Sequence, residues 1–398
     1  MTVVDLNRFP SSQRALDFFA SQTRAPLPAV LALAAFIMKI VLAASTYGTN
    51  DVKTFEEMQE KFESRGAEAL YNEGTEARYG GRVLEVPQMN HPPFVLRLLQ
   101  FWDWCHRIFG GSRGFWLRLT CACADLFAFV LVWLLLRGVA ANFWSLAVLG
   151  VAPVAVMISG FHGNTDPIMI SLVVAAAFSV DRRLPIWLAG AAFGASCSIK
   201  VWPLILMPIF ILSAGAWKRR ALFLGSFAVV VGLLGLPWLF TLRNLIANRV
   251  FDYTPFEGWW GLSFAFPGHG IALRRLVFIV ILAAAVYMHK RVPSVFVQCG
   301  IVSFLFLFLT PGFGPQYLAW AVPWTVAAGW PAAALFHLAA GFYIFQIYAA
   351  WSAHIPWYFG NAYVYPIPHW VLLAGLLAWI MVPLLVFEAY RRNRRPGD

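Results

Sequence analysis

Long apolar runs separated by short polar stretches dominate the chain from residue 27 to residue 388. A membrane-spanning helix needs about 20 mostly apolar residues, and fewer where it lies inside a bundle. By this criterion there are twelve candidate spans, at 27–46, 113–137, 141–159, 166–180, 184–199, 201–216, 221–241, 274–289, 293–310, 316–329, 331–350 and 369–388. The pattern predicts an all-α polytopic membrane protein with about 12 transmembrane helices.

Within the first long polar segment, the pattern changes to that of helices lying at the membrane surface. Phe55, Met58 and Phe62 recur at i, i+3 and i+7 with charges between them, which predicts an amphipathic helix. A second one is expected from Pro93 to Phe109, after the helix-entry signal His91-Pro92-Pro93. Between Thr46 and His91 lie nine of the nineteen acidic residues of the protein. A long charged connection in a multi-span protein is typical of a functional segment.

The composition agrees with a membrane protein. The chain is 60% hydrophobic and 12% charged, with a mean hydropathy of +0.67. Soluble domains are roughly 45–50% apolar and about 25% charged, so the soluble classes are excluded. The net charge of +11 would suit a nucleic-acid-binding protein, but the basic residues lie mainly in short loops and at the C-terminal tail. That distribution is typical of topology signals, so we expect no nucleic-acid partner.

Clusters of basic residues orient the chain, because Lys and Arg concentrate in cytoplasmic loops. With both termini in the cytoplasm, the inner loops receive Arg137, Arg182-Arg183, Lys218-Arg219-Arg220, Lys290-Arg291 and Arg391–Arg395. The opposite face then carries two long extracytoplasmic loops, 47–112 and 242–273. We expect one transmembrane domain over 1–398 without a C-terminal soluble domain, in a bacterial inner membrane, with its site facing the periplasm or exterior.

Polar residues that are costly at membrane depth converge on this outer face. They are Asp51 after the first span, His162, Asn164 and Asp166 between the third and fourth, Lys200 between the fifth and sixth, Arg274 and Arg275 at the start of the eighth, and Gln316 and Tyr317 at the start of the tenth. Each has a structural explanation. Asp51 could pair with Lys53, Asp166 could cap a helix, Lys200 could extend to the headgroups, and the two arginines could bind lipid phosphate without catalysis. Their convergence favours a functional site, and we take Asp51 as its base.

In this order the motifs resemble the GT-C superfamily of integral membrane glycosyltransferases, in the mannosyltransferase-like and glucosyltransferase-like branches that use polyprenyl-phosphate sugars. The matching elements are Asp51 after span one, His91-Pro92-Pro93, the turn 163–167, the turn 200–203, and Gly314-Pro315-Gln316-Tyr317. The resemblance implies that Asp51 is the catalytic base. It also implies that the other residues of the outer face contact the donor and its phosphate, namely Lys200, Arg274, Arg275, His162, Asn164, Asp166, Gln316, Tyr317 and His91.

The residues fit this chemistry independently. An inverting transfer needs a carboxylate that takes the proton of the acceptor hydroxyl as it attacks the anomeric carbon. The leaving phosphate is a weak base, so it needs positive charge rather than a general acid, and Lys200 with Arg274 or Arg275 can supply that charge. The cytoplasmic side has no Asp-x-Asp pair of the kind that binds a nucleotide-sugar through a metal. We therefore expect neither a metal nor another cofactor.

The sequence thus predicts a transferase that moves one hexose or pentose from a polyprenyl phosphate to a glycan, lipid or protein acceptor, among membrane lipids, on the non-cytoplasmic face. One alternative is a lipid or glycan transporter or flippase, which would spread polar residues through both leaflets and contain inverted repeats. Another is a ligase or polymerase that uses a diphosphate lipid, because Arg274 and Arg275 together would suit a diphosphate.

Overall fold

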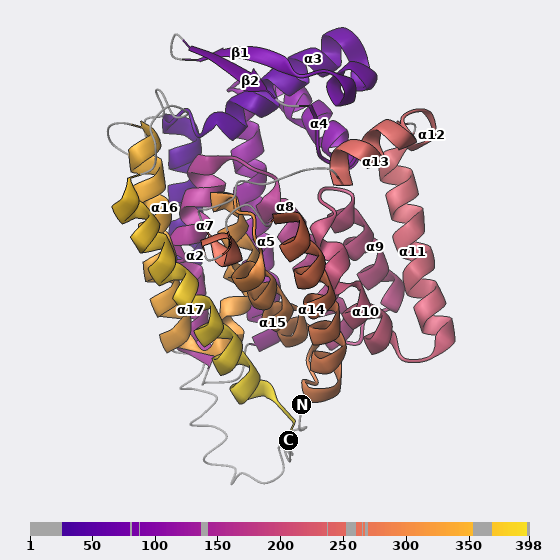
Figure 1. The fold of residues 1–398 in the computed structure, drawn as a ribbon, viewed down its shortest axis with the longest axis vertical. Coiled ribbons are helices and arrows are strands. Elements are labelled where there is room, and N and C mark those ends of the chain that lie inside the picture. The colour runs from indigo at the N-terminus through magenta and orange to yellow at the C-terminus, as the bar shows by residue number, and fades with distance from the viewer. Residues whose placement is uncertain are drawn as a thin grey trace.

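The protein is a helical bundle with a cap of two helices and a β-hairpin at one end (Figure 1). The computed structural model describes residues 26–79, 82–86, 88–136, 142–236, 238–251, 260–264, 266, 270–352 and 368–395. The N-terminal 25 residues, Arg137, most of the 351–368 connection and part of the 242–273 loop lie outside these ranges. The expectations for those segments stay predictions.

Among the described residues, five helical stretches are long and apolar enough to cross a membrane: α2 (Pro26–Ser45), α5 (Arg113–Leu136), the run Phe143–His162, α16 (Trp330–Ser352) and α17 (His369–Asn393). The third of these joins α6 (Phe143–Gly150), α7 (Pro153–Met157) and the π-helix η3 (Ile158–His162). The shorter or more charged helices between them are α8 (Asp166–Asp181), α9 (Ile186–Cys197), η4 (Trp202–Leu206), α10 (Met207–Ala214), α11 (Trp217–Gly235), α14 (Gly270–Arg291) and α15 (Val295–Leu309). The total of twelve spans stays a prediction.

One predicted span has a different structure. Residues 316–329 form two 3₁₀-helices, η6 (Pro315–Trp320) and η7 (Val322–Ala328), each with a proline in its first turn. Almost all of their side chains are buried inside the bundle, including Trp320 and Trp324. Tyr317 lies beside Lys200 near the cap, whereas the carbonyl of Ala327 accepts from Asn393 at the far end of α17, so this stretch runs through the bundle in 3₁₀ form, beside α8 and α15.

The cap consists of α3 (Asn50–Asn72), the hairpin β1 (Thr75–Tyr79) and β2 (Arg82–Val86), and α4 (Phe94–Phe109). Among the described residues this hairpin is the one β element, and the other described elements are helical, as predicted. Its strands pair antiparallel, with Thr75 opposite Val86 and Tyr79 opposite Arg82. In the sequence, Gly80-Gly81 separates them, and two glycines between apolar and β-branched residues are a hairpin signal that the acidic composition of this loop obscured.

Helices α3 and α4 occupy the two segments predicted to form amphipathic helices. The apolar side of α3 packs on protein, because Phe55 and Met58 are buried and the Phe55 ring meets that of Trp102 edge-on, 6.0 Å between centroids. The helix therefore covers the end of the bundle.

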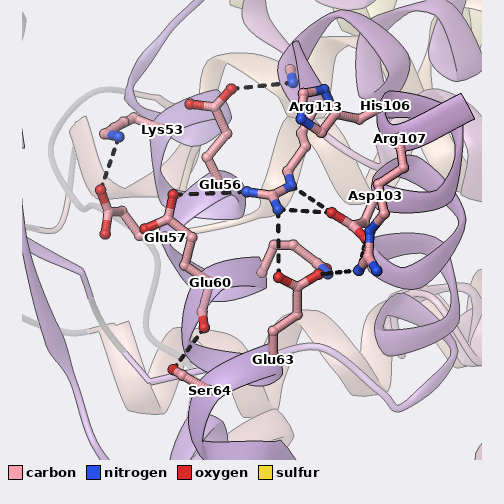
Figure 2. A network of polar contacts seen from close by, with 12 residues as sticks. Lys53, Glu56, Glu57, Glu60, Glu63, Ser64, Asp103, His106, Arg107 and Arg113 are labelled. Atoms are coloured by element: carbon pink, nitrogen blue, oxygen red, sulfur yellow. Dashed lines mark hydrogen bonds and ion pairs between the residues drawn. The ribbon is translucent and has the colours of Figure 1, made fainter. Parts of the chain in front are cut away.

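A polar network fastens the cap to the start of α5 (Figure 2). Arg113 bonds Asp103 through Nε at 2.9 Å and reaches Glu63 at 3.4 Å, while Arg107 bonds both of these carboxylates. Glu56 accepts a hydrogen bond from the backbone N–H of Gly114 at 3.2 Å. Burial raises the pKa of Asp103, but its bonds to the two arginines outweigh burial and leave that pKa below its ordinary value. The cap is thus held by ionised groups.

The segment after α11 also contacts the cap. Arg97 of α4 lies over the ring of Trp238, 4.6 Å from its centroid, and donates to the carbonyl of Leu236 at 2.8 Å. In α13 (Arg243–Phe251), Arg249 donates to the carbonyl of Tyr71 at 3.2 Å. The beginning of the second long loop therefore lies beside the first.

Labelling of single cysteines tests the orientation. The cap and the α10–α11 connection lie at opposite ends of the bundle (Figure 1). Arg65 of the cap, Lys218 at the start of α11 and Arg391 near the end of α17 are all exposed. In a background with Cys123→Ser, Arg65→Cys should react with an impermeant maleimide from outside the cell. Lys218→Cys and Arg391→Cys should react only after permeabilisation. Reaction of all three from one side would contradict the predicted topology.

Candidate active site

Asp51 lies in the first turn of α3, where the cap meets the bundle. Thr49 is the N-cap of this helix, and its hydroxyl accepts from the Asp51 N–H at 3.3 Å. The same hydroxyl donates to the carbonyl of His162 at 2.7 Å. Thr49 therefore joins the start of α3 to the end of the third apolar run, and the Asp51 side chain remains 25% exposed.

The turn that faces Asp51 depends on a π-helix and two glycines. Helix η3 ends at His162, and Gly163 follows in the left-handed conformation, with φ 76°. A Cβ at Gly163 would lie 2.3 Å from Cγ2 of Val52, and one at Gly48 (φ 78°) would lie 2.6 Å from the same atom. Only glycine lets the two segments approach this closely without strain. Single π turns inside longer helices are frequent at functional sites.

His162 and Asn164 both hold the carboxylate of Asp51. The Nε2 atom of His162 lies 3.0 Å from Oδ2 of Asp51, and Nδ2 of Asn164 donates to the same oxygen at 2.5 Å. Burial raises the pKa of Asp51, but the positive charge that His162 carries when protonated, the hydrogen bonds of His162 and Asn164, and the charge of Lys200 outweigh it, so this pKa lies below its ordinary value. Within the described part of the chain, Oδ1 accepts no hydrogen bond. Asp51 is therefore an ionised carboxylate with one oxygen open.

Lys200 lies on the other side of Asn164. Its Nζ donates to Oδ2 of Asp166 at 2.6 Å and to Oδ1 of Asn164 at 3.1 Å. Asp166 is fully buried, and its second oxygen accepts from Nε1 of Trp320 at 2.5 Å. Since an ammonium group has three N–H donors, one of those on Lys200 remains for a ligand. Asp166 has both oxygens bonded within the protein, so it acts by holding Lys200 in place.

Aromatic rings line the Lys200 side of the site. Tyr317 stacks on Trp320 with 4.1 Å between centroids, and Trp202 stacks on Trp320 at 4.4 Å. The Lys200 ammonium lies 6.0 Å from the centroid of the Tyr317 ring, within range of a cation–π attraction. Gln316, the other residue predicted here, is partly exposed and its amide lies close to Gly314.

His91 adjoins the site as a neutral ring. Its imidazole stacks on Phe55 at 5.8 Å between centroids, and its carbonyl accepts from the Tyr71 hydroxyl at 2.7 Å. Burial lowers the pKa of His91 to about 3, with the charge of Lys200 acting in the same direction and Asp51 opposing it. At physiological pH this ring can offer a hydrogen bond to a ligand and carries no charge.

Helix α14 begins at the end of the bundle nearer the cap (Figure 1), and Arg274 and Arg275 lie in its first two turns. Arg274 is partly buried and Arg275 is exposed. Among the described residues, neither forms a hydrogen bond or an ion pair with Asp51, Asn164 or Lys200. Their contact with a donor phosphate stays a prediction.

The structure adds Arg118 and Tyr348, which we did not select from the sequence. Arg118 of α5 is buried and donates to the hydroxyl and the carbonyl of Thr46, both at 2.9 Å, so it fixes the segment just before Asp51. An arginine inside an apolar run is a signal that would have found it. The Tyr348 hydroxyl lies 2.8 Å from Nδ1 of His162. No local pattern marks this tyrosine in its aromatic-rich helix.

Comparison with known proteins agrees with this fold. No protein-family model matches the chain, and no curated protein matches it either. Among solved structures, the chain is similar to ArnT from Cupriavidus metallidurans in the apo state, with 16% identity and a TM-score of 0.51, over 91% of this chain and 74% of that one. ArnT bound to undecaprenyl phosphate aligns with 13% identity and a TM-score of 0.49, over 91% and 77%. The apo likeness shows that this chain has a fold similar to that of ArnT.

Unfolding measurements test the buried pair. Lys200→Met should lower the free energy of unfolding by about 3–5 kcal/mol, because the fully buried Asp166 loses its counterion. Lys200→Met combined with Asp166→Asn should recover much of that loss. As a control, Lys53→Met removes one partner of the Lys53–Glu57 pair near the surface of α3 and should cost less than about 1 kcal/mol. A Lys200→Met protein as stable as wild type in detergent would show that the pair is not formed.

Proposed function

We propose that this chain, whose fold is similar to that of ArnT, is an integral membrane glycosyltransferase of the GT-C superfamily. It transfers one hexose or pentose from a polyprenyl-phosphate donor to a glycan, lipid or protein acceptor on the non-cytoplasmic face, with inversion. One observation carries the proposal: an ionised Asp51 with an open oxygen lies beside a lysine that has a spare N–H, and Asn164 bonds both. That arrangement suits a reaction that takes up a proton at one end and releases an anion at the other.

Asp51 is the general base in this proposal. The acceptor hydroxyl donates to Oδ1, while Oδ2 stays bonded to His162 and Asn164. As the acceptor oxygen bonds to the anomeric carbon, its proton passes to Oδ1. The bond from that carbon to the phosphate oxygen breaks, and its electron pair leaves with the phosphate. A carboxylate held by two neighbours keeps its rotamer, which general-base catalysis requires.

Lys200 supports the leaving phosphate. Its free N–H can bond a phosphate oxygen, and its charge stabilises the developing dianion in a site shielded from water. Tyr317, Gln316 and the neutral His91 add hydrogen-bonding groups around this position. Arg274 and Arg275, at the same end of the bundle, would supply further positive charge to the donor.

A polar pair deeper in the bundle bears on the transporter alternative. Lys39 of α2 and Asp125 of α5 are 2.7 Å apart, and Ser159 donates to the same carboxylate at 2.5 Å. This pair neutralises itself and joins α2 to α5 and η3. The pair therefore leaves no uncompensated charge at this depth for a transported substrate, which supports the enzyme over the transporter.

Asp51→Asn is the sharpest test of the enzyme. The substitution keeps size and most hydrogen bonding but removes the proton acceptor, and general-base assistance is worth about 10² to 10⁴-fold. In liposomes with a radiolabelled polyprenyl-phosphate sugar, the variant should bind the donor normally and transfer sugar at least about a hundredfold more slowly. Glu57→Gln, on the same helix and paired with Lys53, is the matched control and should stay near wild type. Normal transfer by Asp51→Asn would refute the mechanism.

Variants at the phosphate end distinguish monophosphate from diphosphate donors. Lys200→Ala should reduce kcat/KM by about ten- to a hundredfold, the effect of losing one charge-assisted bond. Arg274→Ala and Arg275→Ala should differ from each other, because adjacent helix residues point about 100° apart. The transfer rate of each variant is measured with a monophosphate lipid and with a diphosphate lipid that carry the same sugar. Wild-type rates for all three variants would place the phosphate site elsewhere, and turnover of the diphosphate lipid alone would favour the ligase alternative.

A further inference from the structure

A buried tyrosine lies behind the histidine that holds Asp51. Tyr348, in α16, is fully buried, and its hydroxyl is 2.8 Å from Nδ1 of His162. The other ring nitrogen, Nε2, is 3.0 Å from Oδ2 of Asp51. Side chains from α16, η3 and α3 therefore form one line of hydrogen bonds that ends at the proposed base.

The positions of the hydrogens in this line follow from its two ends. An ionised Asp51 can only accept, so the hydrogen facing it belongs to Nε2 of His162. At the other end, His162 Nδ1 is the hydrogen-bond partner of the Tyr348 hydroxyl within the described part of the chain. A buried O–H left without an acceptor is costly, so Tyr348 donates and Nδ1 accepts. The imidazole is then neutral, with its hydrogen on Nε2.

We propose that Tyr348 is a positioning residue for the transfer reaction, because its hydroxyl holds His162 in the tautomer that donates to Asp51. In this tautomer the histidine stabilises the Asp51 carboxylate, and both of its nitrogens are occupied. It cannot take the acceptor proton itself, which leaves Oδ1 of Asp51 as the proton acceptor. This inference rests on the proposed role of Asp51 as base.

The opposite tautomer would disable the base. If the hydrogen moved to Nδ1, Nε2 would present a lone pair to Oδ2 of Asp51, and two acceptors at 3.0 Å repel unless the carboxyl is protonated. The pKa of Asp51 would then rise. Packing keeps the Tyr348 hydroxyl in place beside Nδ1 of His162. The centroid of the Tyr348 ring lies 5.1 Å from that of Phe161 and 6.0 Å from that of Trp351.

The pH dependence of transfer reports on this arrangement. Besides His162 and Tyr348, the titratable groups that act on Asp51 are Lys200 and His91. With a neutral His162, the hydrogen bonds from His162 and Asn164 and the charge of Lys200 each lower the pKa of Asp51 and so favour the active carboxylate. A less stabilised carboxylate takes up its proton at higher pH, and activity is lost there.

Tyr348→Phe removes one oxygen and is the first test. We expect kcat to fall about tenfold, KM for the donor to stay constant, and the acid limb of the pH–rate profile to move up by at least about one pH unit. Tyr343→Phe, which removes a buried hydroxyl from the same helix, is the control and should leave the acid limb in place. An unchanged acid limb in Tyr348→Phe, whether or not the rate falls, would reduce Tyr348 to a packing residue and overturn the proposal.

Histidine NMR tests the tautomer without any assay of transfer. The full-length protein, labelled with ¹⁵N-histidine in lipid, should show His162 neutral, with a protonated Nε2 and a hydrogen-bonded Nδ1. The signal is assigned by its loss in His162→Asn, and it should change in Tyr348→Phe. A doubly protonated ring, or a hydrogen on Nδ1, would overturn the proposal. Should the tautomer be as expected while Asp51→Asn transfers sugar normally, the proposed function would fail and the hydrogen-bonded line would stand.

Discussion

The two hydrogen bonds of the Asn164 amide are the interaction on which the site depends. A base and a cation close together at a membrane surface would tend to form a direct ion pair, and each would then be neutralised by the other. Asn164 prevents this, because its Nδ2 donates to Asp51 while its Oδ1 accepts from Lys200. Both charges are stabilised, and each keeps one group for a ligand. The amide can do this since it carries a donor and an acceptor on one rigid plane.

The rest of the molecule serves to place that amide. The π-helix η3 and the left-handed Gly163 turn Asn164 toward Asp51, and Thr49 ties the same turn to the start of α3. On the other side, the buried Asp166 holds Lys200. The cap network around Arg113 prevents α3 from swinging away from the bundle. The short distances from Asn164 to Asp51 and to Lys200 thus result from the packing of several separate elements.

Two aspartates of similar sequence setting have different roles in this structure. Asp51 is partly exposed and has an open oxygen, whereas Asp166 is fully buried and has both oxygens bonded to Lys200 and Trp320. Environment therefore decides which carboxylate meets a substrate. The same reasoning distinguishes His162, which bonds Asp51, from His91, which stacks on Phe55.

The sequence by itself determined the membrane class, the two amphipathic helices and the convergence of Asp51, His162, Asn164 and Lys200. These follow from hydrophobic periodicity and from the cost of placing charge in lipid. Both can be read along the chain, because they show where each apolar run ends and which polar residues lie at that end. Only the tertiary structure decided the hydrogen bond between Tyr348 and His162 and the 3₁₀ form of residues 315–328. It also decided that both oxygens of Asp166 are bonded within the protein. Such features depend on side-chain directions and distances within a few tenths of an ångström. Packing between segments far apart in the chain sets those distances, and no pattern along one segment contains them.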